Sequence, residues 1–134
     1  MIALGERYQK GHADLNDIAQ AEAISVKYLS QIIIPLKHAG LIVSFRGAHG
    51  GYMLAKDPQK ITLWDVYMVL EGSASLAECI NDPGKCGQST TCVTRALWGD
   101  LGKTIEKKMA GITIADLVDG RNKAAAAQAI MYNI

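Results

Sequence analysis

One stretch decides the fold: residues 25–54 read SVKYLSQIIIPLKHAGLIVSFRGAHGGYML. Its first part predicts an amphipathic helix that begins after Ser25, a favourable N-cap residue, and runs to about His38. Pro35 is expected to kink or break this helix, because proline lacks a backbone N–H. The helix is expected to bury one face and leave a polar face free; the buried face carries Val26, Leu29, Ile32, Ile33 and Leu36.

The second part of this stretch predicts a β-hairpin. Gly40 is expected to end the helix, and residues 41–45 are rich in the β-branched and aromatic types that favour strands. Residues 46–51 form a glycine-rich turn, and residues 52–54 return as the second strand. A helix followed at once by a hairpin is therefore expected.

The flanking segments complete a recognisable order. Residues 1–9 predict a first helix, and Asp14 is a suitable N-cap for a second. After the hairpin, Thr62 has the spacing of a capping box for a helix over residues 63–70. Helix, helix, helix, hairpin, helix is the order of a winged helix-turn-helix. We therefore predict a DNA-binding domain of this type over residues 1–72.

Residues 73–134 are predicted to hold a cysteine-containing loop, a dimerisation helix and a tail. Ser89 to Thr91 offer N-caps for a long helix that reaches about Met109, and residues 112–118 predict a short final helix. The long helix carries Val93, Leu97, Leu101 and Ile105 at intervals of four. This stripe, together with Gly99 and Gly102, favours a seam between two copies; the alternative is packing on the helix's own core. The predicted fold class is mainly α with a small β-hairpin.

The candidate DNA-reading residues lie on the third helix and the hairpin turn. Short polar side chains near the start of a recognition helix can bond base edges in the major groove, and cations bind phosphates. Arginine at a narrow turn suits the minor groove. The alternatives are an ordinary helix with a solvated face and a turn that needs glycine for backbone reasons. The candidates are Ser25, Lys27, Tyr28, Ser30, Gln31, Arg46, His49, Gly50 and Gly51.

All three cysteines, Cys79, Cys86 and Cys92, fall within one segment that reads CINDPGKCGQSTTC. Its proline, glycines and small polar residues predict a loop that can bend three thiolates toward one point. An odd number of cysteines argues against a pure disulfide framework. Soft thiolates suit an iron–sulfur cluster or zinc, and Cys92 is expected in the first turn of the long helix, where a thiolate is favoured. Three unrelated buried thiols are the alternative.

Composition limits the function classes. The chain has 134 residues, 49% of them hydrophobic and 20% charged, which indicates a globular protein. A net charge of +1 means that any nucleic-acid contact must come from a local basic surface. No apolar run is long enough to span a bilayer and no signal peptide is visible, so a cytoplasmic protein without a membrane partner is expected. No histidine is paired with a nucleophile, so an enzyme is not expected.

At this point the sequence resembles a known family. RGAHGGYML, the preceding KYLSQIIIPLKHAGLI and the later CVTRALW are similar to the IscR/NsrR/CymR-type winged-helix regulators of bacteria. The resemblance implies a homodimer that binds a palindromic site in double-stranded DNA through the third helix and the wing. It also implies a 2Fe–2S or 4Fe–4S cluster on the three cysteines and a role, usually as a repressor, in sensing iron–sulfur, nitric oxide or redox status. Members that answer to cysteine metabolism generally lack the three-cysteine set, which places this chain with the cluster binders.

The chain departs from the family's pattern at three places. Some members have a histidine ligand three residues after the last cysteine, where this chain has Arg95, which cannot ligate. Many have a glutamate two residues after the recognition tyrosine, where this chain has Ser30, which puts glutamate-dependent discrimination in doubt. Met1 aligns inside the family's first helix, so the family's basic opening segment, and any ligand or phosphate contact from it, are expected to lie outside this sequence.

Two further interpretations of the cysteines remain open. A DNA-binding regulator could use them as thiols that oxidise and bind no metal. A zinc-stabilised interaction domain would hold about one zinc per chain, usually through four ligands. Colour separates both from a cluster protein, because iron–sulfur clusters absorb visible light and zinc and free thiols do not.

Overall fold

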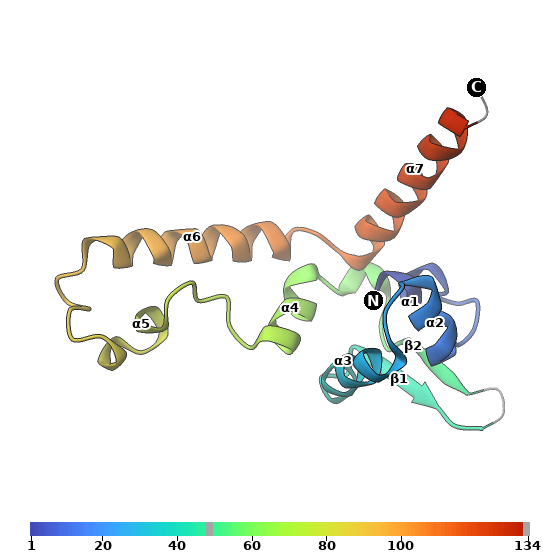
Figure 1. Cartoon of the computed structure of the whole chain (residues 1–134), viewed down its shortest axis with the longest axis horizontal. Coiled ribbons are helices and arrows are strands. Elements are labelled where there is room, and N and C mark those ends of the chain that lie inside the picture. The colour runs from blue at the N-terminus through green and yellow to red at the C-terminus, as the bar shows by residue number, and fades with distance from the viewer. Residues whose placement is uncertain (48–49, 133–134) are drawn as a thin grey trace.

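A computed structural model describes residues 1–47 and 50–132, and it has the winged helix-turn-helix order predicted from the sequence. Figure 1 shows a compact body that holds the N-terminus, an arm formed by α6 and α5, and α7 projecting from the body on another side. The elements are α1 (Ile2–Glu6), α2 (Leu15–Ala21), α3 (Val26–His38), β1 (Ile42–Phe45), β2 (Gly51–Leu54), η1 (Pro58–Lys60), α4 (Leu63–Glu71), α5 (Glu78–Asn81), η2 (Pro83–Lys85), α6 (Val93–Ala110) and α7 (Ile114–Tyr132).

Three helix starts follow from their capping residues, as the sequence predicted. The Asp14 carboxylate accepts from the Asn16 N–H at 2.7 Å, and the Ser25 hydroxyl accepts from the Tyr28 N–H at 3.1 Å. The Thr62 side chain and Asp65 form a reciprocal capping box at the start of α4. These bonds satisfy backbone donors that a helix start leaves without partners, so they set where the helices begin.

The predicted end of the first helix was wrong, whereas the predicted bounds of the third helix are confirmed. The first helix ends at Glu6 rather than Gln9, and Gln9 adopts a positive φ of 63° that no α-helix contains. Pro35 does not break the third helix, which continues to His38. The Ala39 N–H still bonds to the Pro35 carbonyl at 2.9 Å, so proline removes one donor without ending the last turn.

The ends of α6 and α7 also differ from expectation. Ser89 to Thr91 lie in a turn, and Cys92 itself takes the N-cap position of α6. The final helix is far longer than residues 112–118, because Ile114–Tyr132 is one continuous helix. The Thr113 hydroxyl accepts from the Asp116 N–H at 3.1 Å, and the Asp116 carboxylate accepts from the Thr113 N–H. This second capping box and the alanines at 124–127 explain a helix that the sequence analysis cut short.

The hairpin is anchored to the segment before α2. β1 and β2 pair antiparallel with Ile42 opposite Leu54 and Phe45 opposite Gly51. Ala13 adds an isolated bridge to Tyr52, with N–H···O distances of 2.8 and 2.9 Å. The base of the wing is therefore held to the body by main-chain bonds as well as by its own ladder.

The core lies inside the body and includes the first turn of α7. Leu29, Ile33 and Leu36 form the buried stripe of α3, as predicted, whereas Val26, expected on the same face, is 39% exposed and Ile32 is only partly buried. Ile114 of α7 is only 1% exposed, and α6 contributes no buried residue. The buried apolar residues are Leu4, Ala13, Ile18, Ala19, Leu29, Ile33, Leu36, Leu41, Ile42, Leu54, Ile61, Val66 and Ile114.

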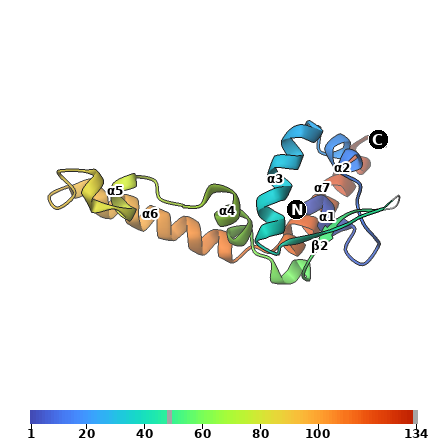
Figure 2. The same cartoon turned by 90° about the horizontal axis from the view of Figure 1, so that it is seen from below.

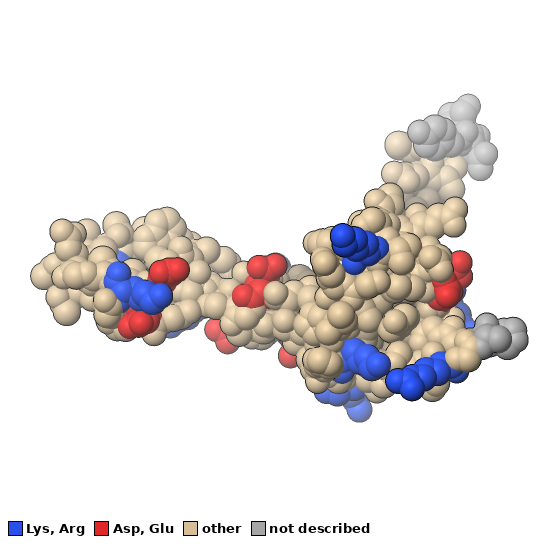
Figure 3. All heavy atoms as spheres, turned by 60° about the horizontal axis from the view of Figure 1, so that its bottom comes forward, with Lys and Arg blue, Asp and Glu red and all other residues tan. Residues whose placement is uncertain are grey.

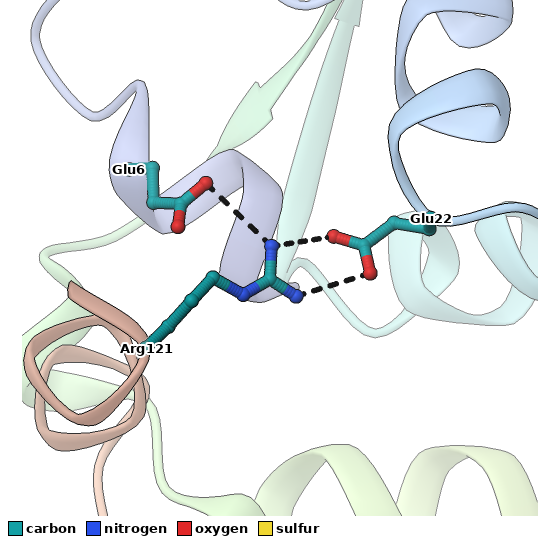
Figure 4. A network of polar contacts seen from close by, with 3 residues as sticks. All are labelled: Glu6, Glu22 and Arg121. Carbon is teal, nitrogen blue, oxygen red and sulfur yellow. Dashed lines mark hydrogen bonds and ion pairs between the residues drawn. The ribbon is translucent and has the colours of Figure 1, made fainter. Parts of the chain in front are cut away.

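Polar contacts also tie α7 to the body. The Ile114 N–H donates to the Ile61 carbonyl at 2.9 Å. Figure 4 shows the Arg121 guanidinium between two carboxylates, with bonds of 2.7 and 3.0 Å to Glu22 and an ion pair of 3.6 Å to Glu6. Hydrogen bonds from Arg121 hold the pKa of Glu22 below its ordinary value. Because Glu22 caps the end of α2, this pair links α7 to the turn that leads into α3.

Candidate DNA-binding surface and cysteine loop

The third helix presents a polar face to solvent. Lys27, Tyr28 and Gln31 are all exposed, and Tyr28 is 56% exposed although it is a large aromatic residue. They lie on the first and second turns of α3, whose opposite face packs into the core. This arrangement leaves a cation, a phenol and an amide free to contact phosphates and base edges.

The two candidate serines are partly committed to the helix itself. Ser25 accepts from the Tyr28 N–H as the N-cap. The Ser30 hydroxyl donates to the Val26 carbonyl at 2.8 Å, so in this conformation its oxygen is available only as an acceptor. Ser25 and Ser30 therefore have a structural use in addition to the predicted DNA contact.

The described part of the wing combines an exposed cation with glycines that the backbone conformation requires. Arg46 is exposed, and Gly47 has a φ of 118°, which L side chains rarely adopt. A Cβ on Gly50 would collide with the Phe45 carbonyl oxygen, and one on Gly51 would lie 2.6 Å from the Ala13 oxygen. Steric need accounts for both glycines whether or not they approach DNA. His49 lies outside the described residues.

The sequence analysis missed a contact that supports the wing. The rings of His12 and Phe45 lie 4.3 Å apart with a tilt of 49°. The two residues come from the loop before α2 and from the end of β1, and nothing in their local sequence patterns predicts the contact. The pair adds an aromatic contact to the wing at the end of the ladder next to the turn.

Basic side chains collect on the part of the body that carries these elements. Figure 3 shows lysine and arginine side chains along the lower edge of the body, while acidic side chains appear on the arm and at the body's side. A local basic surface is what a chain with a net charge of only +1 needs in order to attract nucleic acid. The exposed cations of α3, β1 and its turn, and the segments after β2 are Lys27, Lys37, Arg46, Lys56 and Lys60.

The cysteines lie at the far end of the arm and on three different pieces of structure. Cys79 lies in α5, Cys86 follows η2, and Cys92 caps α6; all three are partly exposed. Within residues 1–47 and 50–132, no three histidine, cysteine or acidic side chains lie close enough to hold a metal ion. The prediction that this segment can bend three thiolates toward one point stays a prediction, since the three are not gathered here. The donor atoms suit an iron–sulfur cluster, but this conformation does not gather them.

The thiol of Cys92 lies among groups that stabilise its negatively charged form. The Thr94 hydroxyl lies 3.2 Å from Sγ, and this contact with the Thr94 and Arg95 N–H groups lowers the pKa of Cys92. Because these groups stabilise the negative form, the thiolate persists to lower pH than in a free cysteine. This effect agrees with the expectation that the start of α6 favours a thiolate.

We expect Thr94→Val to raise the pKa of Cys92, because valine removes the hydroxyl contact while keeping a similar shape. In the metal-free protein, the inflection of the iodoacetamide alkylation rate of Cys92 against pH should then move to higher pH. Thr104→Val is the matched control, since that hydroxyl donates to the Asp100 carbonyl on the same helix. Coincident pH profiles for wild type and Thr94→Val would show that the hydroxyl has no such effect.

The long helix exposes most of the apolar stripe that the sequence predicted, although Ile105 is partly buried. Val93 is 89% exposed, and Leu97, Trp98 and Leu101 are each at least 40% exposed. A Cβ on Gly99 would meet nothing within 4 Å in the described part of the chain. The alternative in which this stripe packs on its own core is therefore not what the structure shows. No helix among the described residues is both long and apolar enough to cross a membrane.

Known proteins with similar sequences and structures are regulators. Residues 1–120 match the family described as "Rrf2: Iron-dependent Transcriptional regulator". Protein rrf2 of Nitratidesulfovibrio vulgaris is 41% identical over 104 residues, which are 78% of this chain and 69% of that protein. The structure of IscR from T. potens is similar with a TM-score of 0.76 and 35% identity, over 98% of this chain and 86% of that one. The structure of CymR, named the global cysteine regulator of B. subtilis, is similar with a TM-score of 0.72 and 35% identity, over 88% of this chain and 86% of that one.

Proposed function

The chain belongs to the Rrf2 family of transcriptional regulators, and on this premise we propose that it is a homodimeric, DNA-binding repressor that senses iron–sulfur, nitric oxide or redox status. We assign the sensing to an iron–sulfur cluster on Cys79, Cys86 and Cys92. The observation that carries the proposal is the joint presence of an exposed polar face on α3 and three cysteines at the far end of the arm, in α5, after η2 and at the start of α6.

In the proposed complex, α3 and the wing contact the DNA. α3 enters the major groove, where Gln31 bonds a base edge and Lys27 and Tyr28 contact phosphates. Arg46, at the end of the wing strand, reaches the adjacent minor groove. Two such units, related by a two-fold axis, bind a palindromic operator.

The proposed dimer forms through the exposed apolar stripe of α6. Val93, Leu97 and Leu101 leave apolar surface in water, and burial against the same stripe of a second copy removes it. A two-fold interface of this kind brings identical surfaces together and fixes the spacing of the two α3 helices. The operator spacing is thus set by α6.

The proposed sensing of iron–sulfur, nitric oxide or redox status depends on the chemistry of the three cysteine side chains. A bound iron–sulfur cluster supplies redox chemistry and a site that nitric oxide or oxygen can attack when one position is weakly ligated. Cys92 offers a thiolate at lower pH than an ordinary cysteine because of its contacts with Thr94 and Arg95. Since the three thiols lie apart here, ligation requires the loop of residues 79–92 to close.

Anaerobic purification followed by an absorption spectrum and iron and sulfide analysis tests the cluster. A brown sample with matched iron and sulfide that loses its colour in Cys92→Ala supports it. Selection from random duplexes tests the DNA half, with an inverted repeat as the expected product. A colourless protein that refuses reconstitution rejects the cluster, and zinc analysis at about one ion per chain then supports a zinc-stabilised domain. If neither the cluster-loaded nor the metal-free protein selects a preferred duplex, the proposed role as a DNA-binding regulator is rejected.

A cluster-free thiol regulator is the second candidate. It is favoured by the separation of the three thiols and by the likeness to CymR, named a global cysteine regulator. In that case oxidation of Cys92, the thiol with the lowered pKa, supplies the signal. The colourless protein would then change its DNA affinity after treatment with peroxide and recover it with dithiothreitol.

A further inference from the structure

Arg95 joins the two ends of the cysteine loop. Its Nε–H donates to the backbone carbonyl of Cys79 at 3.1 Å, across sixteen residues of chain. Arg95 lies on the first turn of α6, three residues after Cys92, and its side chain is partly buried. Of the side-chain hydrogen bonds found in residues 1–47 and 50–132, this is the one that connects α5 with α6. Figure 2 shows α5 lying beside the far end of α6, where this contact is made.

The short helix that carries Cys79 needs such a contact. α5 has four residues, and its N-cap, Ala77, makes no side-chain capping bond. A helix of this length does not persist by its own hydrogen bonds. The Asn81 amide at the end of α5 donates to the Ser73 hydroxyl at 2.8 Å. The Arg95 bond therefore adds a direct link between the backbone of Cys79 and the first turn of α6.

The charge of Arg95 is also suited to this position. A guanidinium stays protonated at every physiological pH. Three ligating thiolates bring three negative charges to one place, and a fixed cation nearby offsets their repulsion. Arg95 has no lone pair to give a metal, so it acts on the cysteines and not as a ligand.

We propose that Arg95 is a positioning residue of the cysteine site, which holds the Cys79 segment against the start of α6 and offsets the charge of the gathered thiolates. The proposal deepens the proposed function and rests on it only where the cluster is concerned. The tether itself is a property of the protein without metal, so it can be tested even if no cluster binds.

Hydrogen exchange in the metal-free, full-length chain tests the tether. In Arg95→Ala, the amides of Ile80 and Asp82, which close the α5 turn, should exchange about tenfold faster, the change expected when one charge-assisted hydrogen bond is lost. Lys103→Ala is the matched control, because Lys103 lines the same hollow beside α6 and makes no bond to Cys79. Equal exchange in wild type and Arg95→Ala overturns the tether.

Arg95→Lys separates the bond from the charge. It keeps the cation but lacks the Nε–H that donates to the Cys79 carbonyl, so α5 amides should exchange as fast as in Arg95→Ala. If wild type holds a cluster, its reduction potential should fall in Arg95→Ala, where the cation is lost, and stay near the wild-type value in Arg95→Lys and Lys103→Ala. An unchanged potential in Arg95→Ala overturns the charge role. A colourless wild type rejects the proposed cluster and with it that role, whereas the exchange result still decides the tether.

Discussion

Ile114→Ala is expected to lower the free energy of unfolding by about 2–5 kcal/mol, the range found when a fully buried isoleucine is truncated. Ile114 is 1% exposed and lies where the first turn of α7 packs into the body. Its N–H also bonds the Ile61 carbonyl, so the neighbouring backbone cannot easily collapse into the cavity. Urea denaturation followed by circular dichroism measures the loss.

Ile130→Ala supplies the control for this prediction. Ile130 lies on the same helix but is 66% exposed, so its truncation should change stability by no more than about 0.5 kcal/mol. Similar small losses for both variants would mean that α7 does not dock on the body. A large loss for Ile114 alone would show that a helix after the arm is part of the DNA-binding unit's core. The division of the chain at residue 72 remains a sequence prediction, and this packing crosses it.

Gly51→Ala is expected to destabilise the protein by about 1–3 kcal/mol, the usual cost of forcing atoms into an occupied space. The new Cβ would lie 2.6 Å from the Ala13 carbonyl oxygen, a backbone atom that cannot rotate away. The Ala13 oxygen also accepts from the Tyr52 N–H at 2.9 Å, so relieving the clash breaks the bridge that anchors the wing. Thermal and urea unfolding, with duplex binding as a second readout, report the effect.

Gly120→Ala should change stability in the opposite direction. Gly120 lies inside α7, and a Cβ there meets nothing within 4 Å among the described residues. Alanine in a helix interior is favoured over glycine by roughly 0.5–1 kcal/mol. If Gly51→Ala destabilised the protein no more than Gly120→Ala does, the Ala13 carbonyl would not lie as close to Gly51 as it does in this structure.

Most of the fold was predicted from local sequence features, namely the residues that cap or end helices. Asp14, Ser25 and Thr62 cap helices because their side-chain oxygens meet backbone N–H groups two or three residues on. Gly72 ends α4 with a φ of 73°, a conformation that glycine adopts without a steric penalty. Each interaction lies within a few residues of chain, so the sequence alone was enough to identify it.

Predictions failed where several weak local preferences had to be added or where a break was assumed. Pro35 removes one donor, yet α3 continues through it because its buried face packs into the core. The tail forms one helix with α7 because the Thr113 cap and a run of good helix formers act together. Neither outcome follows from a single strong signal.

The candidate site was found in part. The sequence identified the polar face of α3 and the exposed stripe of α6, because periodicity alone separates a buried from an exposed face. It did not identify the contact of Arg95 with Cys79 or that of His12 with Phe45. It also predicted a loop around the three cysteines, whereas the structure places Cys79 in the short helix α5, Cys86 after η2 and Cys92 at the start of α6.

By itself, the sequence determined the order of elements, the helix caps, the polar face of α3 and the presence of three cysteines in one loop. Tertiary structure alone decided that Arg121 binds Glu22 across ninety-nine residues and that Ile114 enters the core. The physical reason is range: caps and periodicity act over a few residues, whereas a packed core and an ion pair depend on how distant segments meet. Because α7 meets the body at the turn before α3, the link between α7 and α3 exists only in the folded molecule.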